Sequence, residues 1–291
     1  MRNTLKILFV AAVAAVGFVG LGVEQAHAID VCGNGICATT AVPPESCSVC
    51  PEDCGQCPPI PPDPNVTVVN MIPFAQSTET NQDSEPNLSV NPSNPLQIAG
   101  SAFTPNPTSA TGAAPIFVST DGGATWTLNN IVPSANGMTN DITVRFGGTS
   151  NVLYTGTLRG GSTFTLNISR TTNFTSPTTM ALLVSRAQND QPFVQAATIS
   201  GADRVYVGNN DFNAANGRTA TVDRTLNGTA ATPTWNVLRI ENRATCGQDN
   251  PPIRPAVHAD GTVYAVFLRR RTPTCTSPHT NDVVVVRDDN G

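Results

Sequence analysis

The sequence predicts an all-β fold for residues 66–291, and two observations lead to this prediction. Short runs of Val, Ile, Leu, Phe and Tyr alternate there with turns rich in Gly, Asn, Asp and Pro, and no stretch keeps the 3.6-residue apolar period of a helix. The same region also repeats itself four times, each time as an apolar strand, a turn and a second strand.

The four repeats open near Glu85, Asn140, Gln191 and Arg254. Successive openings are roughly 50 to 65 residues apart, which is room for four short strands and the usual length of a propeller blade. We therefore expect a β-propeller of four-stranded blades, three complete and a fourth without its outermost strand. The favoured interpretation is a fragment of a larger propeller. The alternative is a small propeller that closes on itself, with residues 66–72 as the missing outer strand of the last blade.

A tight turn ends the third strand of each repeat, most clearly in residues 119–126, Ser-Thr-Asp-Gly-Gly-Ala-Thr-Trp. An Asp side chain can accept hydrogen bonds from the turn backbone, Gly permits a positive φ, and Trp can dock on the edge of a blade. Weaker copies lie at residues 168–172, 222–228 and 286–291. These residues are expected to act in folding rather than in chemistry.

Residues 119–126 match the pattern Ser-x-Asp-x-Gly-x-x-Trp of the Asp-box, also called the BNR repeat. With this motif and the blade openings at 85–92 and 190–194, residues 66–291 resemble the secreted bacterial sialidase-like β-propellers. The resemblance implies a six-bladed parent fold. It also implies that Ser119, Asp121, Gly123 and Trp126 are structural residues on the outer rim, away from the sialidase active site. It is therefore informative about the fold and not about activity.

The first 28 residues are typical of a secretory signal. Arg2 and Lys6 form a basic start, residues 7–23 are apolar, and Ala26-His27-Ala28 fits the small-x-small cleavage rule. We expect cleavage there, export to an extracellular or cell-surface location, and no membrane span in the mature protein.

Residues 29–57 form a cysteine-rich module, and residues 58–65 a Pro-rich linker that holds it off the propeller. The module resembles cysteine-rich modules of other secreted bacterial proteins. In an exported protein we expect its six cysteines to pair among themselves, and the two distant cysteines, Cys246 and Cys275, to pair with each other. Zinc is the alternative for the spacing of Cys50, Cys54 and Cys57. The module cysteines are Cys32, Cys37, Cys47, Cys50, Cys54 and Cys57.

Calcium is a weaker possibility for the same module, because oxygen ligands within a disulfide loop suit that ion. The candidate ligands are Asn34, Glu45, Glu52 and Asp53, although their spacing is not that of an EF-hand. We otherwise expect no cofactor.

Composition excludes several functions. The chain has a net charge of −5, and its sole lysine, Lys6, lies in the signal. Binding to DNA or RNA needs clustered basic residues, so it is not expected. A lysine Schiff base and a phosphate-loop lysine are excluded as well.

A sialidase needs an arginine clamp for the substrate carboxylate and a tyrosine nucleophile activated by Glu. The three tyrosines, Tyr154, Tyr206 and Tyr264, share one position in the second strands of successive repeats, which indicates packing. Asp141, Arg145 and Arg254 are the remaining weak catalytic candidates. The sequence thus favours a secreted, non-catalytic propeller that binds an extracellular glycan or protein. The alternative is a glycoside hydrolase of the exo-α-sialidase type whose nucleophile lies in a missing C-terminal part.

Overall fold

The computed structural model describes residues 35–40, 46–47, 50–57, 66–77, 83–108, 112–134, 138–159, 164–213, 219–240, 253–270 and 281–291. The chain divides into two compact units, residues 1–67 and 68–291. Within the described ranges, no helix is both long and apolar enough to cross a membrane.

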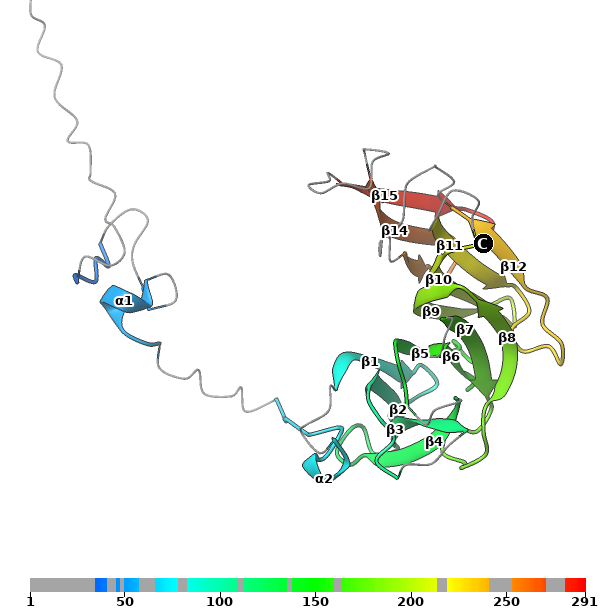
Figure 1. Ribbon diagram of the computed structural model, residues 1–291, viewed down its shortest axis with the longest axis horizontal. Coiled ribbons are helices and arrows are strands. Elements are labelled where there is room, and N and C mark those ends of the chain that lie inside the picture. Colours follow the sequence, from blue (N-terminus) through cyan, green and yellow to red (C-terminus); the bar gives the residue numbers. More distant parts are fainter. Residues whose placement is uncertain are drawn as a thin grey trace, which may run out of the picture. The chain divides into compact units, whose positions relative to one another are not determined.

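The larger unit consists of antiparallel sheets that follow one another along an arc (Figure 1). Three sheets have four strands and the last has three, so the predicted propeller with three complete blades and one partial blade is confirmed. The first is β1 (Ser84–Asn91), β2 (Asn94–Phe103), β3 (Ala113–Ser119) and β4 (Thr127–Pro133); the second is β5 (Ile142–Phe146), β6 (Leu153–Arg159), β7 (Thr165–Thr171) and β8 (Ala181–Ala187). The third is β9 (Asn189–Ile199), β10 (Ala202–Asp211), β11 (Thr219–Thr225) and β12 (Asn236–Arg239); the last is β13 (Arg254–Val257), β14 (Val263–Arg270) and β15 (Asn281–Asp288).

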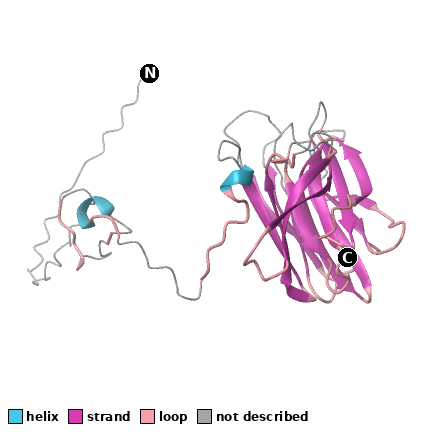
Figure 2. Ribbon diagram, turned by 90° about the horizontal axis from the view of Figure 1, so that it is seen from below, coloured by secondary structure: helices cyan, strands magenta, loops and turns pink. Residues whose placement is uncertain are grey.

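The first strands β1, β5, β9 and β13 contact one another in sequence and form the inner side of the arc. In the view of Figure 2 the strands run between two faces of this unit, and the connections gather at those faces. One face carries the starts of the first strands. The other carries the turns from first to second strand and from third to fourth strand.

Apolar side chains fill the space between successive blades. One buried cluster joins the first two sheets around Ile116 and Phe146, another joins the second and third around Ile168 and Val207, and a third joins the last two around Val222 and Phe267. Each blade therefore buries its faces against its neighbours, which is the favourable term that holds the arc together.

Two of the three tyrosines pack between blades, as predicted. Tyr154 and Tyr206 are 0% and 2% exposed, and the Tyr154 hydroxyl donates a 2.8 Å hydrogen bond to Asp203 of the next blade. Tyr264, in the last sheet, is 40% exposed and lies beside Arg287. Tyr154 and Tyr206 are thus packing residues between blades.

The segment before the first blade does not supply an outer strand. Residues 66–72 form no strand, and they precede the short helix α2 (Phe74–Ser77). Met71 and Ile72 pack instead on the first blade, near Phe117 and Trp126. Gly100 makes this packing possible, because a Cβ there would lie 2.2 Å from the Met71 sulfur. The closed-propeller interpretation that used residues 66–72 in the last blade is therefore wrong.

The turn at residues 119–126 is held by its own side chains. Asp121 accepts hydrogen bonds from the backbone N–H (2.9 Å) and hydroxyl (2.6 Å) of Thr125 and from the Ser119 hydroxyl (2.7 Å). These bonds lower the pKa of Asp121 to about 2. The Trp126 indole donates to the Gly123 carbonyl at 3.1 Å and packs near Met71.

Variants of this turn should lose stability and keep binding. Trp126→Ala should cost about 2–3 kcal/mol through lost apolar contact, and Asp121→Ala should lower the thermal midpoint because the turn loses its acceptor. Calorimetry measures both. If Asp121→Ala kept its midpoint and lost ligand binding, the turn would be a site and not a fold element.

A buried ion cluster ties the second blade to the third. Arg186 of β8 donates to Asp223 at 2.5 Å, to Asp211 at 2.8 Å and to Asn189 at 3.0 Å. Both carboxylates are almost fully buried, and Asp223 also accepts from Asn209 at 2.7 Å. Removal of the guanidinium would leave Asp223 buried and without this counter-charge, while Asp211 keeps a 3.6 Å ion pair with Arg239.

We expect Arg186→Met to destabilise the protein by about 3 kcal/mol or more, because an unpaired buried charge is costly. Urea unfolding measures the difference. Arg287→Met is the matched control, since Arg287 forms an exposed ion pair with Asp289, and it should leave the unfolding curve unchanged. Equal curves for the two variants would contradict the role of Arg186.

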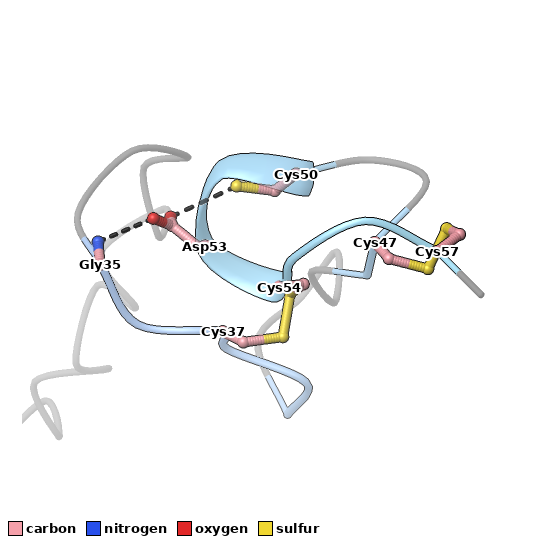
Figure 3. Close-up of a disulfide and its surroundings, with 7 residues drawn as sticks. All are labelled: Gly35, Cys37, Cys47, Cys50, Asp53, Cys54 and Cys57. Atoms are coloured by element: carbon pink, nitrogen blue, oxygen red, sulfur yellow. Dashed lines mark hydrogen bonds between the residues drawn. A yellow bond between two sulfur atoms is a disulfide. The ribbon is translucent and has the colours of Figure 1, made fainter.

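The smaller unit holds disulfides around the short helix α1 (Pro51–Cys54) (Figure 3). Cys37 pairs with Cys54 and Cys47 pairs with Cys57, as expected for bridges within the module. Sulfurs in these bridges are not thiolates, so the zinc alternative loses two of its ligands. Asp53 accepts a 2.7 Å hydrogen bond from the Gly35 N–H. Cys32, Cys246 and Cys275 lie outside the described residues.

Candidate functional site

A polar pocket of about 210 Å³ lies where the first strands of all four sheets begin. We call it the axial pocket, because the first strands form the inner side of the arc. Each sheet contributes its opening residues to the lining. These are Glu85–Asn87 in β1, Asp141–Thr143 at β5, Gln191–Phe193 in β9, and Arg254 at the start of β13.

Side chains on the first strands fix the walls of the pocket. Asn87 accepts a 2.8 Å hydrogen bond from the Val144 N–H of the next blade. Thr143 repeats the arrangement one blade further on, where its hydroxyl accepts from the Val194 N–H at 2.8 Å and donates to the Pro192 carbonyl at 3.3 Å. The side chains of Asn87 and Thr143 are thus bonded to the backbone of the next blade, and the residues next to them in the sequence face the pocket.

Two residues of the lining have an uncommon backbone conformation. Glu85 and Gln191 both have a φ of 53°, and each precedes a proline. Both lie where the pairing of the first and second strands shifts its register. Such irregularities redirect side chains, and a left-handed non-glycine residue costs about 1–3 kcal/mol. The surrounding fold therefore holds these side chains at the pocket against a local penalty.

Asp141 is the titratable centre of the pocket. Burial raises its pKa to about 6, and the negative charges of Glu85 and Asp190 and a hydrogen bond with the Asp190 side chain add to the effect. Asp190 in turn accepts from the Gln191 N–H at 2.9 Å. At mildly acidic pH Asp141 is therefore a proton donor beside two carboxylates.

Arg254 supplies positive charge to the same pocket. Its guanidinium carbon lies 4.8 Å from the ring centre of Phe193, a cation–π arrangement. The charges of Glu85 and Asp141 act on the same guanidinium. The pocket thus offers hydrogen-bond acceptors, one proton donor and one planar cation within a small volume.

The structure brings two of the three candidate catalytic residues together. Asp141 and Arg254 line the axial pocket, whereas Arg145 does not. Arg145 lies further along β5, opposite Tyr154, and is half-buried. Glu85 and Asp190 were missed as site residues. The prolines after Glu85 and Gln191, which mark blade openings, were the signal that could have identified them.

Metal binding receives no support from the part of the chain that is described, where no group of three or more His, Cys, Asp and Glu side chains is placed to hold an ion. Asn34 and Glu45 of the calcium hypothesis lie outside that part. The calcium site stays a prediction.

The sequence matches no model of a known protein family and no curated protein. One solved structure with a similar backbone is the GH93 α-L-arabinofuranosidase of Fusarium graminearum in complex with arabinobiose. It is 14% identical with a TM-score of 0.48, over 75% of this chain and 65% of that one. Another is a mutant of the GH43 protein BlXynB from Bacillus licheniformis, 12% identical with a TM-score of 0.34, over 69% of this chain and 40% of that one. This chain therefore spans less than two thirds of either protein, and likenesses this distant assign no activity.

The raised pKa of Asp141 makes stability depend on pH. The ordinary pKa of the group is 3.8 and the folded value is about 6. Between these values the folded protein keeps a proton that the unfolded chain releases, so stability falls as pH rises through this window. The Asp141→Asn variant does not lose stability in this window, because Asn does not titrate. We expect the variant to be about 1–2 kcal/mol more stable than the parent above pH 7 and equally stable below about pH 4.

Urea unfolding at several pH values measures this effect. Glu52→Gln, which changes an exposed carboxyl in the smaller unit, should leave the pH profile as it is. A parent profile that is flat from pH 4 to 7 would show that Asp141 titrates normally.

Proposed function

We propose that this chain is an exported propeller that binds a carbohydrate at the axial pocket without cleaving it. The convergence of Asp141, Glu85 and Arg254 from three different sheets is the observation that supports the proposal. Groups that converge from separate elements in a small polar cavity are typical of ligand sites.

The chemistry of the pocket suits a sugar. Carboxylates accept hydrogen bonds from hydroxyl groups, and the Arg254 guanidinium donates several in a planar array. A cavity of about 210 Å³ is small, so it would hold one terminal unit of a glycan rather than a polymer segment. Phe193 keeps Arg254 in place by stacking, which lowers the entropy lost when a ligand binds.

Export is part of the proposal. Disulfides persist in oxidising compartments such as the bacterial periplasm and the extracellular space, and the smaller unit contains them. With the predicted signal and the Pro-rich linker, this supports a propeller that is displayed outside the cell on a disulfide-bonded module.

Glycoside hydrolysis is the second candidate, and Asp141 is the observation that favours it. Glycosidases pair a carboxylic acid of raised pKa with a second carboxylate, and Glu85 lines the same pocket. A sialidase would also need a tyrosine nucleophile and an arginine clamp. Tyr154 and Tyr206 are buried between blades, and Arg254 is the one arginine in the described lining.

Titration of the purified protein with sugars tests the proposal. The probes are N-acetylneuraminic acid, galactose, N-acetylglucosamine, xylose and arabinose, each followed by calorimetry. We expect saturable binding of at least one probe, and a loss of affinity of about tenfold or more in Asp141→Asn and Arg254→Ala, since each removes a charged hydrogen-bonding group. Arg287→Ala is the matched control and should bind like the parent.

Turnover is measured in parallel with fluorogenic glycosides, including an α-sialoside. No release above the buffer rate is expected. Release that Asp141→Asn abolishes would replace binding by hydrolysis as the function of the pocket. Absence of binding by every probe would refute the proposal.

A further inference from the structure

A second polar pocket, of about 320 Å³, lies at the other end of the same strands. Three connections form it. The first two blades contribute Ser93, Asn94 and Gln97 around the turn into β2, Asn151 before β6, and residues 172–175 after β7. We call it the amide pocket. The axial pocket lies at the starts of β1 and β5, so the two pockets share strands and open at opposite ends.

The amide pocket carries no charged side chain in its described lining. Its polar groups are amides and hydroxyls. Phe174, the one aromatic residue among them, is buried and packs edge-on against Phe146 at 5.1 Å, so it belongs to the core between blades. The pocket therefore has no groups for ionic recognition and no exposed aromatic platform.

A buried amide orients two of the lining side chains. Asn91 is fully buried, and its Oδ1 accepts a 3.0 Å hydrogen bond from the Ser93 N–H. That bond fixes which atom of Asn91 is nitrogen, and Nδ2 then donates to Gln97 Oε1 at 2.7 Å and to Asn151 Oδ1 at 2.9 Å. Because both oxygens are engaged by Asn91, the nitrogen ends of Gln97 and Asn151 are the ends that a ligand can reach.

In the other two amide side chains of the lining, the oxygen is also bonded within the protein. Asn94 Oδ1 accepts from the Leu96 N–H at 3.2 Å, and Asn173 Oδ1 accepts from the Thr175 hydroxyl at 3.0 Å. Four amide oxygens are thus bonded within the protein. Among the residues that the structure describes, the four nitrogens donate no hydrogen bond. Asn151 has a φ of 55°, a backbone region in which Asn is favoured among non-glycine residues.

We propose that the amide pocket is a second binding site, for a neutral sugar, independent of the axial pocket. Its amide N–H groups would donate to sugar hydroxyl and ring oxygens, and the Thr172 hydroxyl would act as donor or acceptor as the ligand requires. The Ser93 hydroxyl donates to the Gly148 carbonyl at 3.5 Å and would act as an acceptor. Neutral donors without a cation favour an uncharged ligand, because an anion would lose its hydration without gaining a counter-charge. The volume lies at the lower end of the range for small-molecule sites, which suits one sugar unit.

Isosteric variants test the site, because they change only the end that faces the ligand. Gln97→Glu and Asn151→Asp keep the oxygen that accepts from Asn91 and replace the nitrogen donor by an acceptor. Asn236→Asp, on the exposed strand β12, adds the same charge elsewhere. Thermal midpoints are measured for all three, and Gln97→Ala is used if a carboxylate variant does not fold.

The readout is an NMR titration of the isotope-labelled protein with glucose, galactose, mannose, N-acetylglucosamine, xylose and arabinose, and with sodium sulfate. We expect saturable shifts of the Gln97 and Asn151 side-chain amides with at least one sugar. The affinity should fall about tenfold or more in Gln97→Glu and Asn151→Asp and stay unchanged in Asn236→Asp.

Three results would overturn the proposal: no saturation by any sugar at millimolar concentration, saturation by sulfate alone, or sugar binding that Gln97→Glu and Asn151→Asp leave unchanged. Failure of this site is distinguishable from failure of the axial pocket. Asp141→Asn should remove shifts around the axial pocket and leave those of Gln97 and Asn151, and Gln97→Glu should do the reverse.

Discussion

Contact between the faces of successive blades is the interaction on which the larger unit depends. The three clusters between blades are each shared by two neighbouring sheets, so the blades bury these faces only together. Hydrogen bonds that Asn87 accepts from the second blade and Thr143 accepts from the third then align the first strands. The axial pocket follows from this alignment, since its lining comes from the openings of strands that have to lie side by side.

The two ends of the strands carry different chemistry. At the axial end, carboxylates and one guanidinium lie close together, and burial together with the charges of Glu85 and Asp190 raises the pKa of Asp141. At the other end, the side chains are neutral and a buried amide sets their orientation. Salt would therefore screen recognition at the axial pocket and have little effect at the amide pocket, because only the first depends on charge.

The repeat was sufficient to predict the blades, because an apolar strand pattern and a turn recur at each opening. Expected openings near Glu85, Asn140, Gln191 and Arg254 fall within two residues of where β1, β5, β9 and β13 begin. The site was harder to predict. Asp141 and Arg145 lie four residues apart in one extended segment, roughly 13 Å along a strand, so only the first can reach the strand end. Glu85 and Gln191 enter the pocket through register shifts, and the prolines that follow them mark the blade openings but not the direction of these side chains. The amide pocket needs turns from two blades, and its order depends on Asn91, which sequence alone does not place.

The glycines of the second strands have a consequence for how such a protein can change. A Cβ on Gly156 would lie 2.8 Å from Val194, and one on Gly208 would lie 2.3 Å from the Ile253 carbonyl oxygen. At Gly208 backbone meets backbone, next to Arg254, which opens β13, whereas Gly156 meets the side chains of Val194 and Pro192 in β9. Neither position has room for a side chain, so the close approach of the blades beside the axial pocket depends on both glycines. Substitutions at positions 85, 141, 191 and 254 change side chains that line the pocket without adding an atom at these contacts. Ligand preference can therefore diverge among related chains while the second strands keep their close approach.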